Sequence, residues 1–152
     1  RKSDDLIHWS EPYQVENYQN FDIDSKLIQL DDGSFLMAYV SYENNAIVIS
    51  ISEDGETWVE NQTISSSTYL SMNISLIKDE GAVRLFYSSN NNFYSHSLDQ
   101  SVQFTERLII RSDVSFGPLV VKMPDGTLGI VYSLDLNEQR DVYFENIGTV
   151  AN

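Results

Sequence analysis

The carboxylates that could do chemistry in this chain lie in polar segments between apolar runs. We single out Asp22, Asp24, Asp113 and Glu138. Two carboxylates about 6.5–9.5 Å apart can hydrolyse a glycosidic bond with inversion, one as general acid and the other as general base. No flanking sequence distinguishes these four residues from solvated loop acids, so the sequence by itself assigns no catalytic residue.

A second group of loop residues has side chains suited to sugars. Aromatic rings offer flat apolar faces for the C–H surfaces of a sugar ring, while amide and guanidinium groups hydrogen-bond to hydroxyls. The residues that we expect on a ligand-binding face are Tyr18, Tyr42, Tyr69, Asn73, Arg111 and Arg140. This mixture favours a glycan ligand; the alternative is that these loops are polar only because they face water.

The composition excludes several other kinds of chemistry. The chain has no cysteine, which excludes a thiol nucleophile, a disulfide and a thiolate metal site. Nine Lys and Arg residues against 23 Asp and Glu residues give a formal net charge of −14, which repels phosphate backbones and anionic lipids. We therefore expect neither a nucleic-acid partner nor a membrane partner.

Metal binding has little support in the sequence. His8 and His96 have no second histidine nearby, so we expect structural roles for both. The pairs Asp31-Asp32 and Asp22-x-Asp24 could contribute oxygen ligands to a calcium site, although neither has the ligand spacing of a dedicated calcium loop. We expect no other cofactor.

A repeated hairpin organises the elements that must position these residues. An acidic residue followed by glycine occurs at Asp32-Gly33, Glu80-Gly81 and Asp125-Gly126, with a tyrosine six positions after each glycine. The three glycines lie 48 and 45 residues apart. Apolar runs flank each pair, a pattern typical of a β-hairpin closed by a primed turn.

A second motif recurs in phase with the hairpins. A serine, an aspartate two residues later and an aromatic residue further on occur at Ser3, Asp5 and Trp9, at Ser52, Asp54 and Trp58, and at Ser97, Asp99 and Phe104. Short oxygen-bearing side chains at this spacing favour a turn in which they accept hydrogen bonds from backbone N–H groups. We expect the aromatic residue after each turn to pack against a neighbouring unit.

Together the two motifs predict an all-β protein. Each repeat has about four short strands in roughly 45 residues, which is the sequence signature of a β-propeller blade. We expect a single unit over residues 1–152, with blade repeats at about 18–64, 65–110 and 111–147. Residues 1–15 complete the last blade, because a fourth strand is expected at about 9–15.

This phase relation predicts one blade shared by the two ends of the sequence. An expected third strand at 141–147 would pair with the expected fourth strand at 9–15. Three blades are too few to close a ring, which takes about four to eight. We therefore expect either two copies closing a six-bladed ring as a homodimer or a chain that belongs to a longer propeller.

The best-formed motif resembles a known repeat. Residues 52–58 read Ser-Glu-Asp-Gly-Glu-Thr-Trp and are similar to the Asp-box, or bacterial neuraminidase repeat, one residue shorter than the family form. The copy at 3–9 has neither the glycine nor the threonine, and the copy at 97–104 has lost the glycine and the tryptophan. The family's box lies on an outer hairpin, away from the ligand. The resemblance therefore implies structural roles for Ser3, Asp5, Trp9, Ser52, Asp54, Gly55, Trp58, Ser97, Asp99 and Phe104.

Proteins with this box include sialidases, other glycoside hydrolases and non-catalytic binding propellers. The resemblance implies an extracellular or cell-surface location, although the sequence contains no signal peptide. Sialidases of the family use an arginine triad, and only Arg111 and Arg140 of the five arginines fall in expected ligand-facing loops. We therefore expect a glycan-binding or interaction scaffold without a complete catalytic site. The alternative is a portion of a glycoside hydrolase, exo-sialidase or arabinanase-like, completed by further blades or a symmetry mate.

Overall fold

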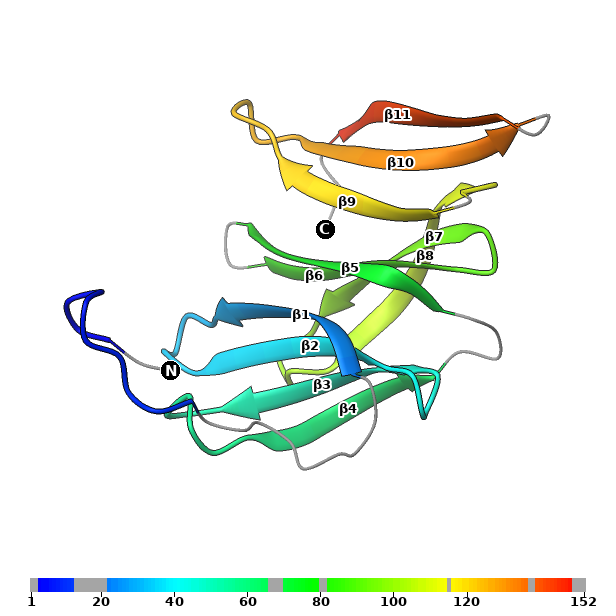
Figure 1. The fold of residues 1–152 in the computed structure, drawn as a ribbon. Coiled ribbons are helices and arrows are strands. Elements are labelled where there is room, and N and C mark those ends of the chain that lie inside the picture. The colour runs from blue at the N-terminus through cyan, green and yellow to red at the C-terminus, as the bar shows by residue number, and fades with distance from the viewer. Residues whose placement is uncertain are drawn as a thin grey trace.

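The computed structural model describes residues 3–12, 22–65, 70–79, 82–114, 116–136 and 139–148. The strands among these residues form three antiparallel sheets, in which neighbours in space are also neighbours in sequence (Figure 1). Sheet 1 consists of β1 (Asp22–Gln29), β2 (Phe35–Ser41), β3 (Ala46–Ser52) and β4 (Val59–Ser65). Sheet 2 consists of β5 (Leu70–Asp79), β6 (Ala82–Ser89), β7 (Asn92–Leu98) and β8 (Phe104–Ser112). Sheet 3 consists of β9 (Phe116–Lys122), β10 (Leu128–Leu136) and β11 (Gln139–Gly148). The predicted all-β class is confirmed.

The Asp-Gly pairs close hairpins, as predicted, but through a different turn. Between β1 and β2, the N–H of Gly33 donates to the carbonyl of Leu30 over 3.1 Å. The N–H of Leu30 donates to the carbonyl of Ser34 over 2.8 Å. Only the glycine is left-handed, with φ of 91° at Gly33 and 84° at Gly126 in the equivalent β9–β10 turn. These are three-residue loops with a glycine bulge. The primed-turn prediction is wrong because the aspartate before each glycine keeps a negative φ; Glu80-Gly81 lies outside the described residues.

Side-chain alternation gives each sheet two unlike faces. We call the face that carries Tyr39, Tyr87 or Tyr132 the tyrosine face of its sheet, and the opposite one the apolar face. In one buried cluster, Leu36, Ile47 and Ile49 of the apolar face of sheet 1 pack with Leu85 and Tyr87 of sheet 2.

The second buried cluster repeats this arrangement one sheet further along. Phe86 and Phe93 of the apolar face of sheet 2 pack with Ile130 and Tyr132 of sheet 3. Sheets 2 and 3 therefore each place their tyrosine face on the apolar face of the preceding sheet. The first strands β1, β5 and β9 lie side by side along the stack.

A side chain of β4 also joins sheets 1 and 2 at their outer edge. Gln62 Nε2 donates to the carbonyl of Phe104 over 3.0 Å, and Gln62 Oε1 accepts from the N–H of Phe104 over 2.7 Å. The amide of Gln62 thus pairs with the backbone of β8 much as a neighbouring strand would.

Among the described residues, no fourth strand joins sheet 3. Residues 9–12 are not in a strand, and residues 13–15 lie outside the described residues. Within the described ranges, sheet 3 has three strands with β11 at its edge, and the three sheets form no closed ring. The physical reason is the order of the stack: residues 13–21 connect the segment to β1, and sheet 2 separates sheet 1 from sheet 3.

Candidate functional site

The expected ligand-binding face corresponds to one end of the sheets, which we call the loop end. Backbone pairing places the start of β1 beside the β2–β3 turn, through Asp22 and Ser41, and the start of β5 beside the β6–β7 turn, through Leu70 and Ser89. The Asp-Gly turns and the turns at Asp54 and Asp99 lie at the opposite end. The described residues that we singled out as catalytic or ligand-binding candidates therefore belong to one end of their sheets.

Each first strand carries a β-bulge close to the loop end. The pairing registers shift between Ile23 and Lys26 in β1, between Leu70 and Ile74 in β5, and between Phe116 and Leu119 in β9. Bulges re-aim side chains and are over-represented next to binding sites. The sequence alone does not predict these bulges. The recurrent tyrosine, which lies beside the bulge on the second strand, is the signal that marks their position.

Asp24 is part of the β1 bulge and serves as a structural link. Its carboxylate pairs with Lys26, and its Oδ2 accepts a hydrogen bond of 2.6 Å from the N–H of Ile74 in β5. Asp24 adopts a left-handed φ of 51°, and its side chain is 18% exposed. Because these contacts occupy the carboxylate, the arrangement favours a role in joining sheets 1 and 2.

Two loop-end segments of sheets 2 and 3 are joined directly. The N–H of the buried Val114 donates to the carbonyl of Asn91 over 2.9 Å, which ties the β8–β9 connection to the β6–β7 turn. Asn90, Asn91 and Asp113 all adopt left-handed φ values, between 55° and 68°. The side chains of these three residues are exposed. Two amides and a carboxylate are thus presented to solvent from one hydrogen-bonded junction.

Three more candidates are exposed at the loop end. Tyr42 is 40% exposed, and its carbonyl accepts a hydrogen bond of 3.3 Å from the N–H of Asn45 that closes the β2–β3 turn. Asn73 lies in the β5 bulge, and Arg140 pairs with Asp135 in the register of β11 and β10. An aromatic ring, an amide and a guanidinium are therefore exposed at this end of the sheets.

Arg111 has a different environment from the predicted one. Its guanidinium forms an ion pair of 2.6 Å with Glu145 and lies 4.8 Å from the centre of the Tyr132 ring. The Tyr132 hydroxyl donates to Glu145 over 3.1 Å. Burial, and then this hydrogen bond to a carboxylate, raise the pKa of Tyr132. The phenol therefore stays protonated, which makes it a poor nucleophile and a good link between β10 and β11.

A second polar cluster lies inside the interface of sheets 1 and 2. The Tyr87 hydroxyl and His96 Nε2 are 3.1 Å apart, and Nδ1 of His96 is buried without a hydrogen-bond partner among the described residues. Burial, followed by the charge of Arg107, lowers the pKa of His96. The histidine is thus a neutral core residue, as the structural reading of the sequence expects.

Several candidates lie where the structure gives no side-chain geometry. Tyr18, Tyr69 and Glu138 are outside the described residues. Asp22 opens β1, and only its backbone is described. Of the carboxylate candidates, Asp24 and Asp113 can therefore be placed, and only the second is exposed to solvent.

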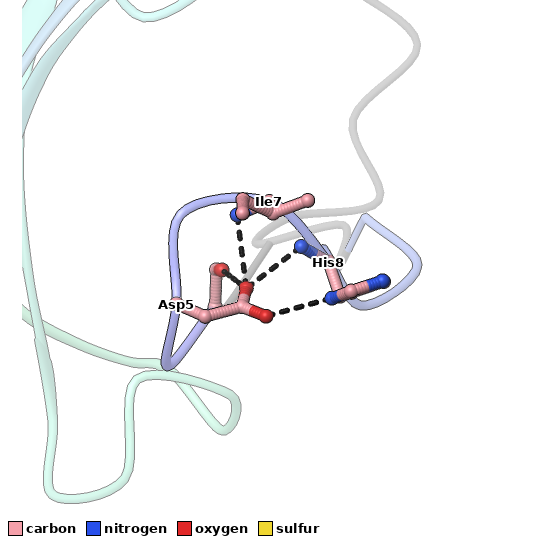
Figure 2. Close-up of polar contacts among 4 residues, drawn as sticks. Asp5, Ile7 and His8 are labelled. Carbon is pink, nitrogen blue, oxygen red and sulfur yellow. Dashed lines mark hydrogen bonds and ion pairs between the residues drawn. The ribbon is translucent and has the colours of Figure 1, made fainter.

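The turns at Asp5 and Asp54 share the contacts of their aspartate carboxylates. Asp5 Oδ1 accepts from Ser3 Oγ over 3.2 Å and from the N–H groups of Ile7 and His8 over 2.9 and 2.8 Å, while His8 Nδ1 lies 2.7 Å from Oδ2 (Figure 2). Contacts of Asp5 with the His8 side chain and backbone, then with Ile7, hold the pKa of the carboxyl far below its usual value.

Asp54 makes the corresponding contacts with residues of its own turn. Its Oδ1 accepts from Ser52 Oγ over 3.0 Å and from the N–H groups of Glu56 and Thr57 over 2.7 Å each, and Thr57 Oγ1 donates to Oδ2 over 3.2 Å. The backbone N–H groups of Thr57 and Glu56 are the main reason that the pKa of Asp54 is also far below its usual value. Gly55 is left-handed with φ of 75°, and Leu6 occupies the equivalent place with φ of 61°.

The turn at Asp99 is a looser version. Asp99 Oδ1 accepts from the N–H groups of Ser101 and Gln103 over 2.8 and 2.9 Å. Ser97 is bonded instead to Arg84, over 3.1 Å, and Phe104 is buried in the interface of sheets 1 and 2. The aromatic residues of the other two turns differ in exposure, since Trp58 is half-buried and Trp9 is 52% exposed.

The calcium candidates are engaged in contacts of their own. Asp31 forms an ion pair of 2.6 Å with Lys78, and Asp32 Oδ1 accepts from the N–H and hydroxyl of Ser34 over 2.9 and 2.6 Å. No group of three histidine or acidic side chains within the described ranges is placed to hold a metal ion. In the same part of the chain, no helix is long and apolar enough to cross a membrane.

Comparison with known proteins adds no relative to these observations: no protein-family model matches the chain, and no curated protein matches it either.

Proposed function

We propose that the chain is a β-propeller module of Asp-box blades that binds glycans at its loop end and has no complete catalytic site of its own. The observation that carries this proposal is the repeated bulge. Three first strands lie side by side, and each is bulged next to the loops with exposed polar and aromatic side chains. Propeller ligands bind at such an end when the blades surround a common axis.

The chemistry of the loop end favours binding over hydrolysis. Tyr42 offers an exposed ring, and Asn90 and Asn91 offer amides that can both donate and accept hydrogen bonds. The carboxylate of Asp24 is engaged by Lys26 and by the N–H of Ile74. Among the described candidates, this leaves Asp113 without a second carboxylate that could act with it in catalysis. An inverting hydrolase needs two free carboxyl groups.

A glycan array followed by titration calorimetry tests this proposal. We expect Kd values between about 1 μM and 1 mM for at least one glycan class. Tyr42→Ala should weaken binding at least about tenfold by removing the stacking surface. Val59→Ala is the matched control, because Val59 is 65% exposed and lies next to the Asp54 turn, away from the loop end.

Two outcomes would contradict the proposal. Binding unaffected by Tyr42→Ala, or no binding on the array, would show that the loop end is not a glycan site. Turnover of a chromogenic glycoside, lost in Asp113→Asn, would favour the glycoside hydrolase alternative.

A further inference from the structure

The outer side of β11 is an open place in the third sheet. In sheets 1 and 2 the third strand, β3 or β7, pairs with a fourth strand on its outer side, whereas no described strand pairs with the outer side of β11. Val142 and Phe144 of β11 are 74% and 57% exposed. In the pairing of β11 with β10, these two residues occupy the positions that Ile47 and Ile49 occupy in the pairing of β3 with β2. Both isoleucines are fully buried.

The segment that could pair with the outer edge of β11 follows a turn that is already formed. β4 directly follows the Asp54 turn, and the Asp5 turn makes the same serine, backbone and side-chain contacts (Figure 2). The residues after the Asp5 turn, 9–12, correspond to the start of β4 yet form no strand. Ile7 and Trp9 are 76% and 52% exposed, so the turn is formed while both apolar side chains remain largely open to solvent.

We propose that a second copy of this chain fills the open edge: the segment starting at Trp9 of one copy pairs with β11 of the other. This inference rests on the repeat geometry used for the proposed function. The connections 66–69 and 113–115 each join a fourth strand to the first strand of the next sheet in the stack. By the same rule, the segment before β1 belongs to a sheet that lies against the tyrosine face of sheet 1.

Sheet 3 of the same chain cannot be that sheet, because it lies on the far side of sheet 2 (Figure 1). A second copy can supply it, and the exchange is reciprocal under two-fold symmetry. The apolar face of sheet 3, with Leu119, Val142 and Phe144, then continues the two interfaces already present in the stack. The tyrosine face of sheet 1 is already buried in the single chain at Tyr39, Val48 and Ser50, so the proposed contact requires the second copy to replace what covers these residues.

The repeat also fixes the register of the contact. Val59 pairs with Ile51 in sheet 1. Ser10 follows Asp5 by the same number of residues as Val59 follows Asp54, so Ser10 is the equivalent of Val59. Asn146 follows Tyr143, which pairs with Tyr132, by the same number of residues as Ile51 follows Val48, which pairs with Tyr39. Asn146 is therefore the equivalent of Ile51. Ser10 of one copy should therefore lie opposite Asn146 of the other.

Disulfide trapping tests this register cleanly, because the chain contains no cysteine. Paired residues of adjacent antiparallel strands have Cα atoms about 4.5–5.5 Å apart, which suits a disulfide. We expect Ser10→Cys/Asn146→Cys to oxidise to a covalent dimer on non-reducing gels. A mixture of the single variants Ser10→Cys and Asn146→Cys should give a disulfide-linked heterodimer. The control Ile51→Cys/Val59→Cys has the same register within one chain and should oxidise as a monomer.

Solution mass gives an independent measurement. Light scattering should show twice the chain mass of 17.4 kDa. Phe144→Asp should raise the dimer dissociation constant at least tenfold, while Val59→Asp, at an exposed residue away from β11, should leave it unchanged. A monomer at high concentration, or a Ser10–Asn146 disulfide formed only within one chain, overturns the proposal. Either result together with retained glycan binding would refute this inference and leave the proposed function standing.

Discussion

The Gln62 amide provides a direct test of how the sheets are joined at their outer edge. Gln62→Leu preserves the approximate size of the side chain and removes both hydrogen bonds to the backbone of Phe104. A neutral hydrogen bond contributes about 0.5–1.5 kcal/mol net, so losing two should lower the free energy of unfolding by about 2 kcal/mol. Phe104 is only 3% exposed, so water does not readily replace the lost amide as a partner of its two backbone groups.

Urea unfolding followed by tryptophan fluorescence measures this effect. With an m-value of about 2 kcal/mol/M, the midpoint should fall by about 1 M. Thr63→Val is the control: Thr63 is exposed and donates to Glu60 of its own strand, so we expect a change within about 0.5 kcal/mol. If Gln62→Leu changed stability no more than Thr63→Val, the amide would not join the sheets and the reasoning would be refuted.

Three further predictions concern the core, a buried histidine and a turn. Leu85→Ala removes a fully buried side chain from the interface of sheets 1 and 2 and should cost about 2–5 kcal/mol by denaturant unfolding, whereas a cost below about 1 kcal/mol would contradict the packing. Burial and Arg107 hold the pKa of His96 below its ordinary 6.5, so the unfolded chain takes up the proton first. The contribution of neutral His96 to the free energy of unfolding is therefore present above about pH 6.5 and is lost as the pH falls below that value. The difference in stability between about pH 8 and about pH 5 should shrink in His96→Gln, and an unchanged pH profile would exclude this role. Gly126→Ala should cost about 1–2 kcal/mol through backbone strain alone, since φ is 84° and no atom lies within 4 Å of the added Cβ; a neutral result in thermal unfolding would contradict that conformation.

Features determined by short segments could be predicted from the sequence. The turns at Asp5 and Asp54 depend on contacts within six residues, so serine and aspartate spacing was enough to predict their hydrogen bonds. The hairpins followed from apolar runs on either side of a glycine. Their turn type did not follow, because a primed turn and a glycine bulge both accept the same Asp-Gly pair.

Features that depend on contacts between distant segments escaped prediction. Arg111 and Glu145 are 34 residues apart, and no local pattern around Glu145 marks it as the partner of a candidate ligand-binding arginine. Gln62 and Phe104 are 42 residues apart, and an amide on an outer strand looks like any solvated side chain. The β-bulges are set by how a first strand fits against its neighbours, so their residues show no motif of their own.

The two unlike faces of each sheet also bear on how such a chain can change in length. Every contact between consecutive sheets joins the same two kinds of surface, so an extra unit of this kind inserted into the series meets a suitable neighbour on both sides. Duplicating or deleting a whole sheet therefore leaves every interface between consecutive sheets of the same kind. Losing half of a sheet leaves two neighbouring surfaces that do not match. Gene duplication in steps of one unit is the change that this architecture tolerates best.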